Sequence, residues 1–155
     1  MSARLMIPAA SPAAREVPAP RRVRHPFVIG RRLAPALAVL GVHQDTAWVE
    51  VDDEHLHLRF GPLTMRTPVS SVGSVFSFGE PVVGPRITAT RHGLRLITGA
   101  GPRIAIELDG AVPGVPGWSV PRARSITVTV EQSYRLAHRI RQHIEARTFN
   151  PADRL

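Results

Sequence analysis

Apolar and polar side chains alternate with a period of two from Thr46 to Thr67. This pattern constrains the fold most strongly, because it requires strands with one buried and one exposed face. It predicts strands at Thr46–Val51 and His55–Phe60, and a third strand, Thr64–Thr67, after a tight reversal of the chain. The sequence therefore predicts antiparallel strands that cover a core with one of their faces.

The register of the second and third strands follows from the same alternation. With Phe60 opposite Leu63, a single face of this hairpin collects the apolar side chains, which are Leu56, Leu58, Phe60, Leu63 and Met65. The other face collects His55, His57, Arg59, Thr64 and Arg66. A shift by one residue would mix the two sets, so this register is the one we expect.

Strand-like segments continue through the rest of the chain. They are Val72–Phe78, Arg86–Thr90, Leu94–Thr98, Arg103–Leu108 and Ile126–Val130. A long loop, Asp109 to Arg124, separates the last two, and a helix from about Gln132 to Arg147 follows. The predicted class is α+β, mainly antiparallel β: a small barrel or bent sheet of seven to eight strands with one C-terminal helix.

A short helix is predicted before the first strand, because Leu33, Leu37 and Leu40 repeat at helical spacing, Pro35 suits a first turn and Gly41 suits a stop. The predicted core combines strand and helix positions. It consists of Val49, Val51, Leu56, Leu58, Phe60, Met65, Leu96, Ile104, Ile106, Leu136 and Ile140.

The 155 residues suffice for one domain, which we place at residues 27–148. Residues 1–26 are rich in Pro, Ala and Arg and are expected to be a disordered tail, and residues 149–155 a short C-terminal tail. The longest apolar run, Leu33 to Val42, is about half as long as a membrane-spanning helix. No transmembrane segment and a cytoplasmic location are therefore expected.

All 20 basic side chains are arginines, against 12 acids, which gives a formal charge of +8. Two explanations stay open: selection for phosphate binding, because the guanidinium is a good phosphate fork, and the codon usage of a GC-rich genome. The chain has no cysteine, which excludes disulfides, thiolate zinc sites and cysteine nucleophiles.

Several short blocks resemble uncharacterised actinobacterial proteins related to the bacterial pleckstrin-homology-like (PH-like) families. The longest is LRFGPLTMRTPVSSV, Leu58 to Val72. The others are Leu40-Gly41-Val42, Gly84-Pro85-Arg86, His92-Gly93-Leu94, Val112-Pro113-Gly114 and Ile126 to Val130. The resemblance spans roughly residues 27–137 and implies a small PH-like barrel, but it implies no activity.

No catalytic motif is found, so the chain is expected not to be an enzyme and to use no cofactor. His55 and His57 lie on one strand face at a spacing that suits a metal pair, but the chain lacks a third ligand at a fixed spacing, and no metal site is expected. The acids of the Asp52-Asp53-Glu54 turn are expected to be solvated. The alternative is a small enzyme that uses His55, His57 or His92 at a barrel mouth.

The function expected from the sequence is binding of a protein partner. The first candidate site is Trp118, Arg122 and Arg124 in the long loop, and the second is His57, Arg59 and Arg66 on the polar hairpin face. The alternative partner is an anionic surface, nucleic acid or acidic lipid. Its contacts would be Arg21, Arg22, Arg24, Arg135 and Arg139.

Overall fold

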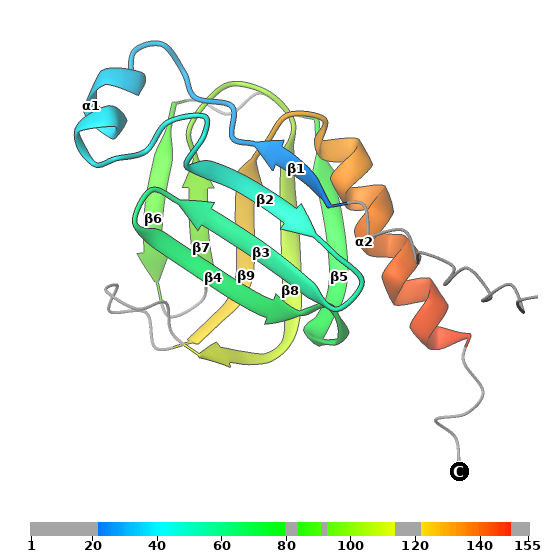
Figure 1. The fold of residues 1–155 in the computed structure, drawn as a ribbon. Helices are drawn as coiled ribbons and strands as arrows, with labels where there is room; N and C mark the ends of the chain where they lie inside the picture. The colour runs from blue at the N-terminus through cyan, green and yellow to red at the C-terminus, as the bar shows by residue number, and fades with distance from the viewer. Residues whose placement is uncertain (1–21, 80–83, 91–92, 114–121, 150–155) are drawn as a thin grey trace, which may run out of the picture.

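The alternating segment forms three antiparallel strands in the computed structural model, which describes residues 22–79, 84–90, 93–113 and 122–149 (Figure 1). They are β2 (Ala47–Val51), β3 (His55–Phe60) and β4 (Leu63–Pro68). Phe60 pairs with Leu63 across the reversal, and every apolar side chain assigned to that face is buried. The predicted register of the hairpin is confirmed.

A further strand, β1 (Val23–Pro26), pairs with β2 and completes a four-stranded sheet of order β1-β2-β3-β4. The expected tail is therefore wrong at its last residues, and residues 1–21 lie outside the described part of the chain. His25 pairs opposite Val49 and is buried, so this short strand is held by packing as well as by its ladder. Pro26 is tolerated because β1 is an edge strand.

The second sheet has five strands in the order β5-β8-β9-β7-β6. These are β5 (Val72–Phe78), β6 (Arg86–Thr90), β7 (Gly93–Ile97), β8 (Arg103–Pro113) and β9 (Arg122–Thr129). The expected loop from 109 to 124 is shorter than predicted, because β8 and β9 continue their ladder past a register shift between Glu107 and Val112. β9 also pairs parallel with β7, the one parallel pair among the described strands.

The two sheets pack across a shared apolar core, with the four-stranded sheet in front of the five-stranded sheet in Figure 1. They are separate sheets, so the described strands form no closed barrel, and the bent-sheet alternative describes the molecule. All core residues predicted from the sequence are buried. The class, mainly antiparallel β with one C-terminal helix, is confirmed.

Helix α2 (Ser133–Thr148) packs against β5 and places Leu136, Ala137 and Ile140 in the core. Its N-cap is Gln132 in the left-handed region (φ 52°), and no side-chain hydrogen bond caps the helix there. None of the described helices has the length and apolar character needed to cross a membrane.

Two arginines of α2 protect the free edge of the five-stranded sheet. Arg141 donates to the carbonyl oxygen of Val75, and Arg147 donates to those of Ser70 and Val72. β5 is an edge strand, and an edge with unpaired backbone groups is a template for aggregation unless it is covered. Part of the arginine excess therefore serves the fold.

The first helix, α1 (Ala34–Val39), is shorter than the segment from which it was predicted. Pro35 lies in its first turn, as expected, and Leu37 is buried. Leu40 is 64% exposed, so the predicted apolar face is only partly right. The chain leaves the helix through Gly41 with a positive φ of 74°, which a glycine adopts without strain.

We expect truncation of Leu58 or Ile140 to alanine to lower the free energy of unfolding by about 2–5 kcal/mol, because each leaves a cavity in a packed core. Urea denaturation followed by circular dichroism measures the change. The control is Leu40→Ala, at an exposed position, where we expect a change within about 0.5 kcal/mol. Equal losses in all three variants would contradict the assignment of the core.

His25 connects β1 to the start of α2, and its Nδ1 lies 3.3 Å from the carbonyl oxygen of Glu131. Burial lowers the pKa of His25 below its usual value of 6.5; the Glu131 carbonyl raises it, and the positive charges of Arg139 and Arg135 lower it further. The unfolded chain therefore takes up this proton more readily than the folded chain. Stability from a neutral His25 is complete above about pH 6.5 and is lost as the pH falls below that value.

We expect the free energy of unfolding to fall between about pH 7 and pH 5 with a slope of up to about 1.4 kcal/mol per pH unit for this one proton. His25→Gln, which stays neutral, should flatten that slope, whereas His138→Gln, at an exposed position on α2, should leave it unchanged. Urea denaturation at a series of pH values gives both slopes. An unchanged slope in His25→Gln would show that another group takes up the proton.

Candidate functional site

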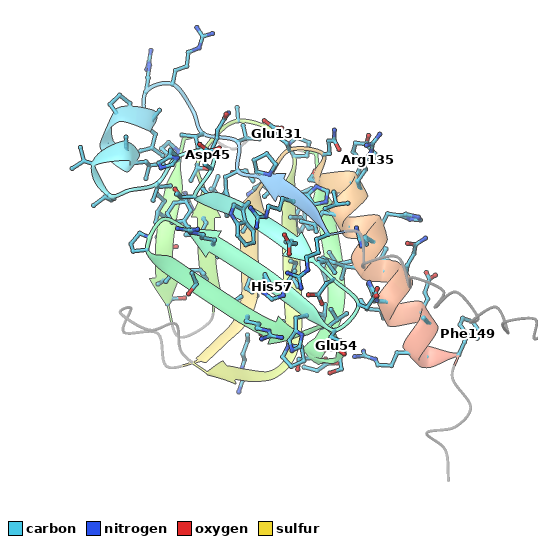
Figure 2. The ribbon with its side chains drawn as sticks, viewed as in Figure 1. Asp45, Glu54, His57, Glu131, Arg135 and Phe149 are labelled. Carbon is cyan, nitrogen blue, oxygen red and sulfur yellow. The ribbon has the colours of Figure 1, made fainter. Side chains whose placement is uncertain are left out.

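The outer face of the four-stranded sheet carries a row of charged side chains that crosses all four strands. The register pairs Arg24 with Glu50, Glu50 with His57, and His57 with Arg66. Figure 2 places His57 near the middle of this sheet. Because positive and negative groups are neighbours in the row, they act mainly on one another.

Glu50 is buried although it lies on the outer face, and two arginines pair with it. The Nε atom of Arg24 donates to Glu50 Oε2 at 2.9 Å, and the Nε of Arg22 lies 3.9 Å from Oε1. The Arg24 guanidinium also lies 4.3 Å from the ring centroid of Trp48. Arg24, expected from the sequence to contact phosphates, is therefore engaged within the protein, and Arg21 lies outside the described residues.

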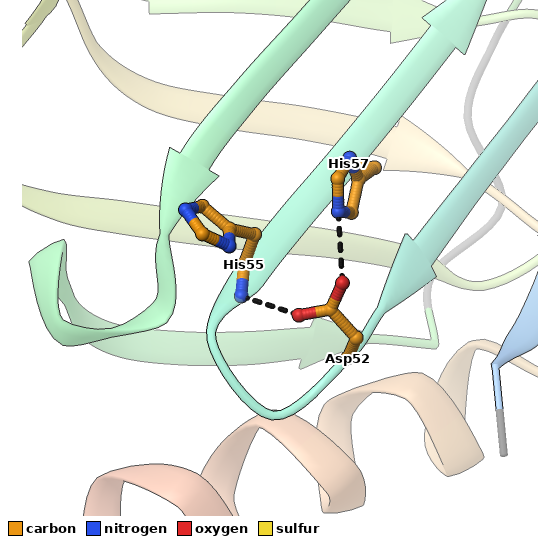
Figure 3. A group of neighbouring side chains, drawn as sticks. All are labelled: Asp52, His55 and His57. Atoms are coloured by element: carbon orange, nitrogen blue, oxygen red, sulfur yellow. Dashed lines mark hydrogen bonds and ion pairs between the residues drawn. The ribbon is translucent and has the colours of Figure 1, made fainter. Parts of the chain in front are cut away.

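Asp52 lies at the end of β2 and organises the turn that leads to β3 (Figure 3). Its Oδ1 accepts the backbone N–H groups of Glu54 at 2.9 Å and of His55 at 2.7 Å, and its Oδ2 lies 3.0 Å from His57 Nε2. Asp52 is buried, so the expectation of a solvated carboxylate is wrong at this position. The sequence carried a signal that Asp52 belongs to the sheet and not to a solvated turn. Trp48, Glu50 and Asp52 alternate along the chain and therefore share one strand face.

The pKa of Asp52 is lowered to about 2. Burial alone would raise this pKa, but the backbone N–H groups of Glu54 and His55 and the imidazole of His57 stabilise the charged form more strongly. The carboxylate therefore stays ionised near neutral pH and faces His57 with one oxygen.

The predicted hairpin-face residues lie together, as expected, but two of them contact polar groups of the same face. Arg66 Nη2 lies 3.1 Å from His55 Nδ1, and His57 faces Asp52. Arg59 is exposed, with its Nε 3.4 Å from the carbonyl oxygen of Gly61. The Asp52 cluster, which we define as Asp52, His55, His57 and Arg66, is thus the most organised polar group on this face.

The predicted loop site is not brought together with the hairpin face. Trp118 lies outside the described residues, and so does the side chain of Arg122, whose backbone begins β9. Arg124 is exposed on β9, in the other sheet. Of the helix arginines, Arg135 is exposed and donates to Gln132 Oε1 at 3.2 Å, and Arg139 is half-buried.

Sequence reasoning missed a second surface, the face of the five-stranded sheet that is turned away from the core. One row across this sheet is Phe76, Ala105, Thr127, Arg95 and Thr88. In the next row Phe78 pairs with Arg103, whose guanidinium carbon lies 5.8 Å from the phenyl centroid. We call this surface the open face, because Phe76, Arg95 and Thr88 in the first row are exposed on it.

Phe76 and Phe78 are 47% and 45% exposed. They point to the same side of β5, at alternate positions of a strand whose other face is in the core. Arg86 and Arg95 are exposed on the same side of the sheet, and Glu107 is the acid nearest to the phenylalanines in the register. The phenylalanines lie on the edge strand β5, and these two arginines lie near the opposite edge, on β7 and β6. Exposed aromatic side chains and arginines on one face are typical of binding surfaces.

We expect Arg24→Ala to lower the free energy of unfolding by about 1–2 kcal/mol. The change leaves the buried Glu50 carboxylate with Arg22 at 3.9 Å as its remaining arginine partner. Because Arg24 is itself exposed, the loss stays limited. In a Glu50→Gln background the same change should cost less, since a neutral amide is cheaper to bury. Urea denaturation of the four proteins of this cycle gives the coupling. Equal costs in both backgrounds would contradict the pairing.

No protein family, no curated protein and no solved structure matches the chain. The resemblance to the PH-like families therefore stays a prediction, and the geometry of the two surfaces carries the functional argument.

Proposed function

We propose that the protein is a non-catalytic binding domain and that its open face binds an acidic segment of a protein partner with apolar side chains. The observation that carries the proposal is the pair of half-exposed phenylalanines, Phe76 and Phe78, on the outer face of the five-stranded sheet. Arg103 lies beside Phe78 on the next strand, and Arg95 and Arg86 lie farther across the same face. Burying each ring on binding would contribute about 1–2 kcal/mol. Such side chains are common among the residues that dominate binding energy.

Charge favours an acidic partner. Arg86, Arg95 and Arg103 lie on this face, whereas Glu107 already accepts a hydrogen bond from Ser74 at 3.1 Å. The Nε of Arg103 is buried without a hydrogen-bond partner in the described part of the chain, so a partner carboxylate near this guanidinium would add a favourable contact. A partner with carboxylates between apolar residues satisfies both the rings and the guanidiniums.

The PH-like resemblance supports binding rather than catalysis, because domains of that fold commonly bind partners at edges and loop ends. The loop that carries Trp118 connects β8 and β9, two strands of the same sheet. We therefore keep Trp118 as a second contact of the same partner. A cytoplasmic location and the absence of enzymatic activity are parts of this proposal.

The test starts with selection of displayed random peptides on the full chain, followed by measurement of the affinity of the selected peptides by fluorescence anisotropy. We expect the selected peptides to combine acidic and apolar residues. Phe76→Ala and Phe78→Ala should each weaken their binding by about tenfold or more, and Arg95→Ala by a smaller factor that decreases with salt. Peptides without acidic residues would contradict the proposed partner.

The matched control is Phe149→Ala, because Phe149 is an equally large aromatic side chain that is 83% exposed at the end of α2 and belongs to no strand of the open face (Figure 2). It should leave peptide binding unchanged. Single-stranded DNA, RNA and anionic vesicles are measured in parallel. Binding to these that falls steeply with salt, with no dependence on Phe76 or Phe78, would overturn the proposal in favour of an anionic surface. Loss of peptide binding only in Trp118→Ala would overturn it in favour of the loop.

A further inference from the structure

The sequence spacing of His55 and His57 offers only two metal ligands. The turn between β2 and β3 supplies a third, Asp52. Asp52, His55 and His57 each place a potential ligand atom within 4.8 Å of the other two (Figure 3). The histidines are half-buried neighbours on β3, and Asp52 comes from the end of β2 on the same sheet face. The fold therefore brings together two imidazoles of β3 and one carboxylate from the end of β2.

We propose that Asp52, His55 and His57 form a binding site for a first-row transition-metal dication of the zinc type. Imidazole nitrogen together with one carboxylate oxygen is a ligand set of zinc and its neighbours, whereas calcium and magnesium prefer oxygen ligands alone. Three protein ligands leave a fourth position of a tetrahedral ion open.

The separation of Asp52 and His57 suits such an ion. Asp52 Oδ2 and His57 Nε2 are 3.0 Å apart. Two ligands of one tetrahedral zinc ion, each about 2.0 Å from the metal, are separated by about 3.3 Å. The ion would replace the hydrogen bond between these two atoms.

The orientation of Asp52 is already fixed by contacts that a ligand carboxylate needs. Its Oδ1 accepts two backbone N–H groups of the turn, which leaves Oδ2 to face the histidines. Supporting hydrogen bonds of this kind hold ligands in place and reduce the cost of binding.

Arg66 opposes the ion. Its Nη2 lies 3.1 Å from His55 Nδ1, so the guanidinium must move away from this nitrogen, and its charge repels a dication. Arg66 is exposed, and its side chain is free to turn toward solvent. Removal of Arg66 should therefore strengthen metal binding, a result that a purely structural role of the cluster does not predict.

The experiment titrates Zn²⁺ by calorimetry, and Co²⁺ by its visible absorption, into the full chain after treatment with a chelator. We expect one ion per chain in the wild type. His55→Gln and His57→Gln should each weaken binding by at least about tenfold. Arg66→Ala should strengthen it several-fold. His138→Gln, on the exposed side of α2, is the matched control and should bind as the wild type does.

Three results would overturn the site: a wild-type dissociation constant above about 1 mM, unchanged affinity in both histidine variants, or weaker binding in Arg66→Ala. If a histidine variant does not fold, as judged by circular dichroism, the wild type still decides the question. Substoichiometric Co²⁺ should then broaden the ring-proton NMR signals of His55 and His57 before those of the other histidines, and uniform broadening would contradict the proposal.

Discussion

The segment that follows β1 holds the two sheets together, and the rest of the structure depends on it. The backbone N–H of Phe27 donates to Ala47 in the four-stranded sheet, and that of Val28 donates to Thr129 in the five-stranded sheet. The Phe27 ring is fully buried and meets Phe60 edge-on at 5.3 Å. Gly99 is required at this junction, because a Cβ there would lie 2.5 Å from the carbonyl oxygen of Val28.

The junction fixes the two sheets around one core. Their outer faces then present different kinds of side chain to a ligand or partner. The four-stranded sheet presents polar and charged side chains that contact one another, such as Arg24 with Glu50 and His57 with Asp52. The five-stranded sheet presents exposed phenyl rings. The first face suits a small ion that replaces an internal contact, and the second suits a chain that covers apolar surface. The proposed metal site and the proposed partner site are therefore independent.

Net charge is a poor guide to function in this protein, because many arginines have structural contacts. Arg141 and Arg147 bond the edge of β5, Arg24 neutralises a buried carboxylate, and Arg66 lies against His55. These four arginines of the described residues thus add to the formal charge of +8 while they make contacts within the protein. Arg86 and Arg95, exposed on the same sheet face as the phenyl rings, bear more directly on the proposed binding.

Local pattern explains the success and the limits of prediction for the binding surfaces. The hairpin register placed His57, Arg59 and Arg66 on one face, because alternation in a strand is a property of neighbouring residues. The contact of His57 with Asp52 was missed, because three acids in a turn look solvated until the fold shows which one is covered. The open face was missed for a related reason: the sequence of β5 does not tell which of its apolar residues a helix or second sheet will cover.

The sequence by itself determined the strands β2 to β4, the apolar set that fills the core and the helix at the C-terminus, since each depends on periodic burial within a short segment. Only the tertiary structure decided the strand β1, the parallel pairing of β7 with β9 and the assembly of Asp52 with two histidines. The first two features join segments far apart in sequence, through contacts that exist only after the chain has folded, so no local pattern records them. The third lies within one hairpin, where the alternation places the side chains on one face but does not show the contact of Asp52 with His57.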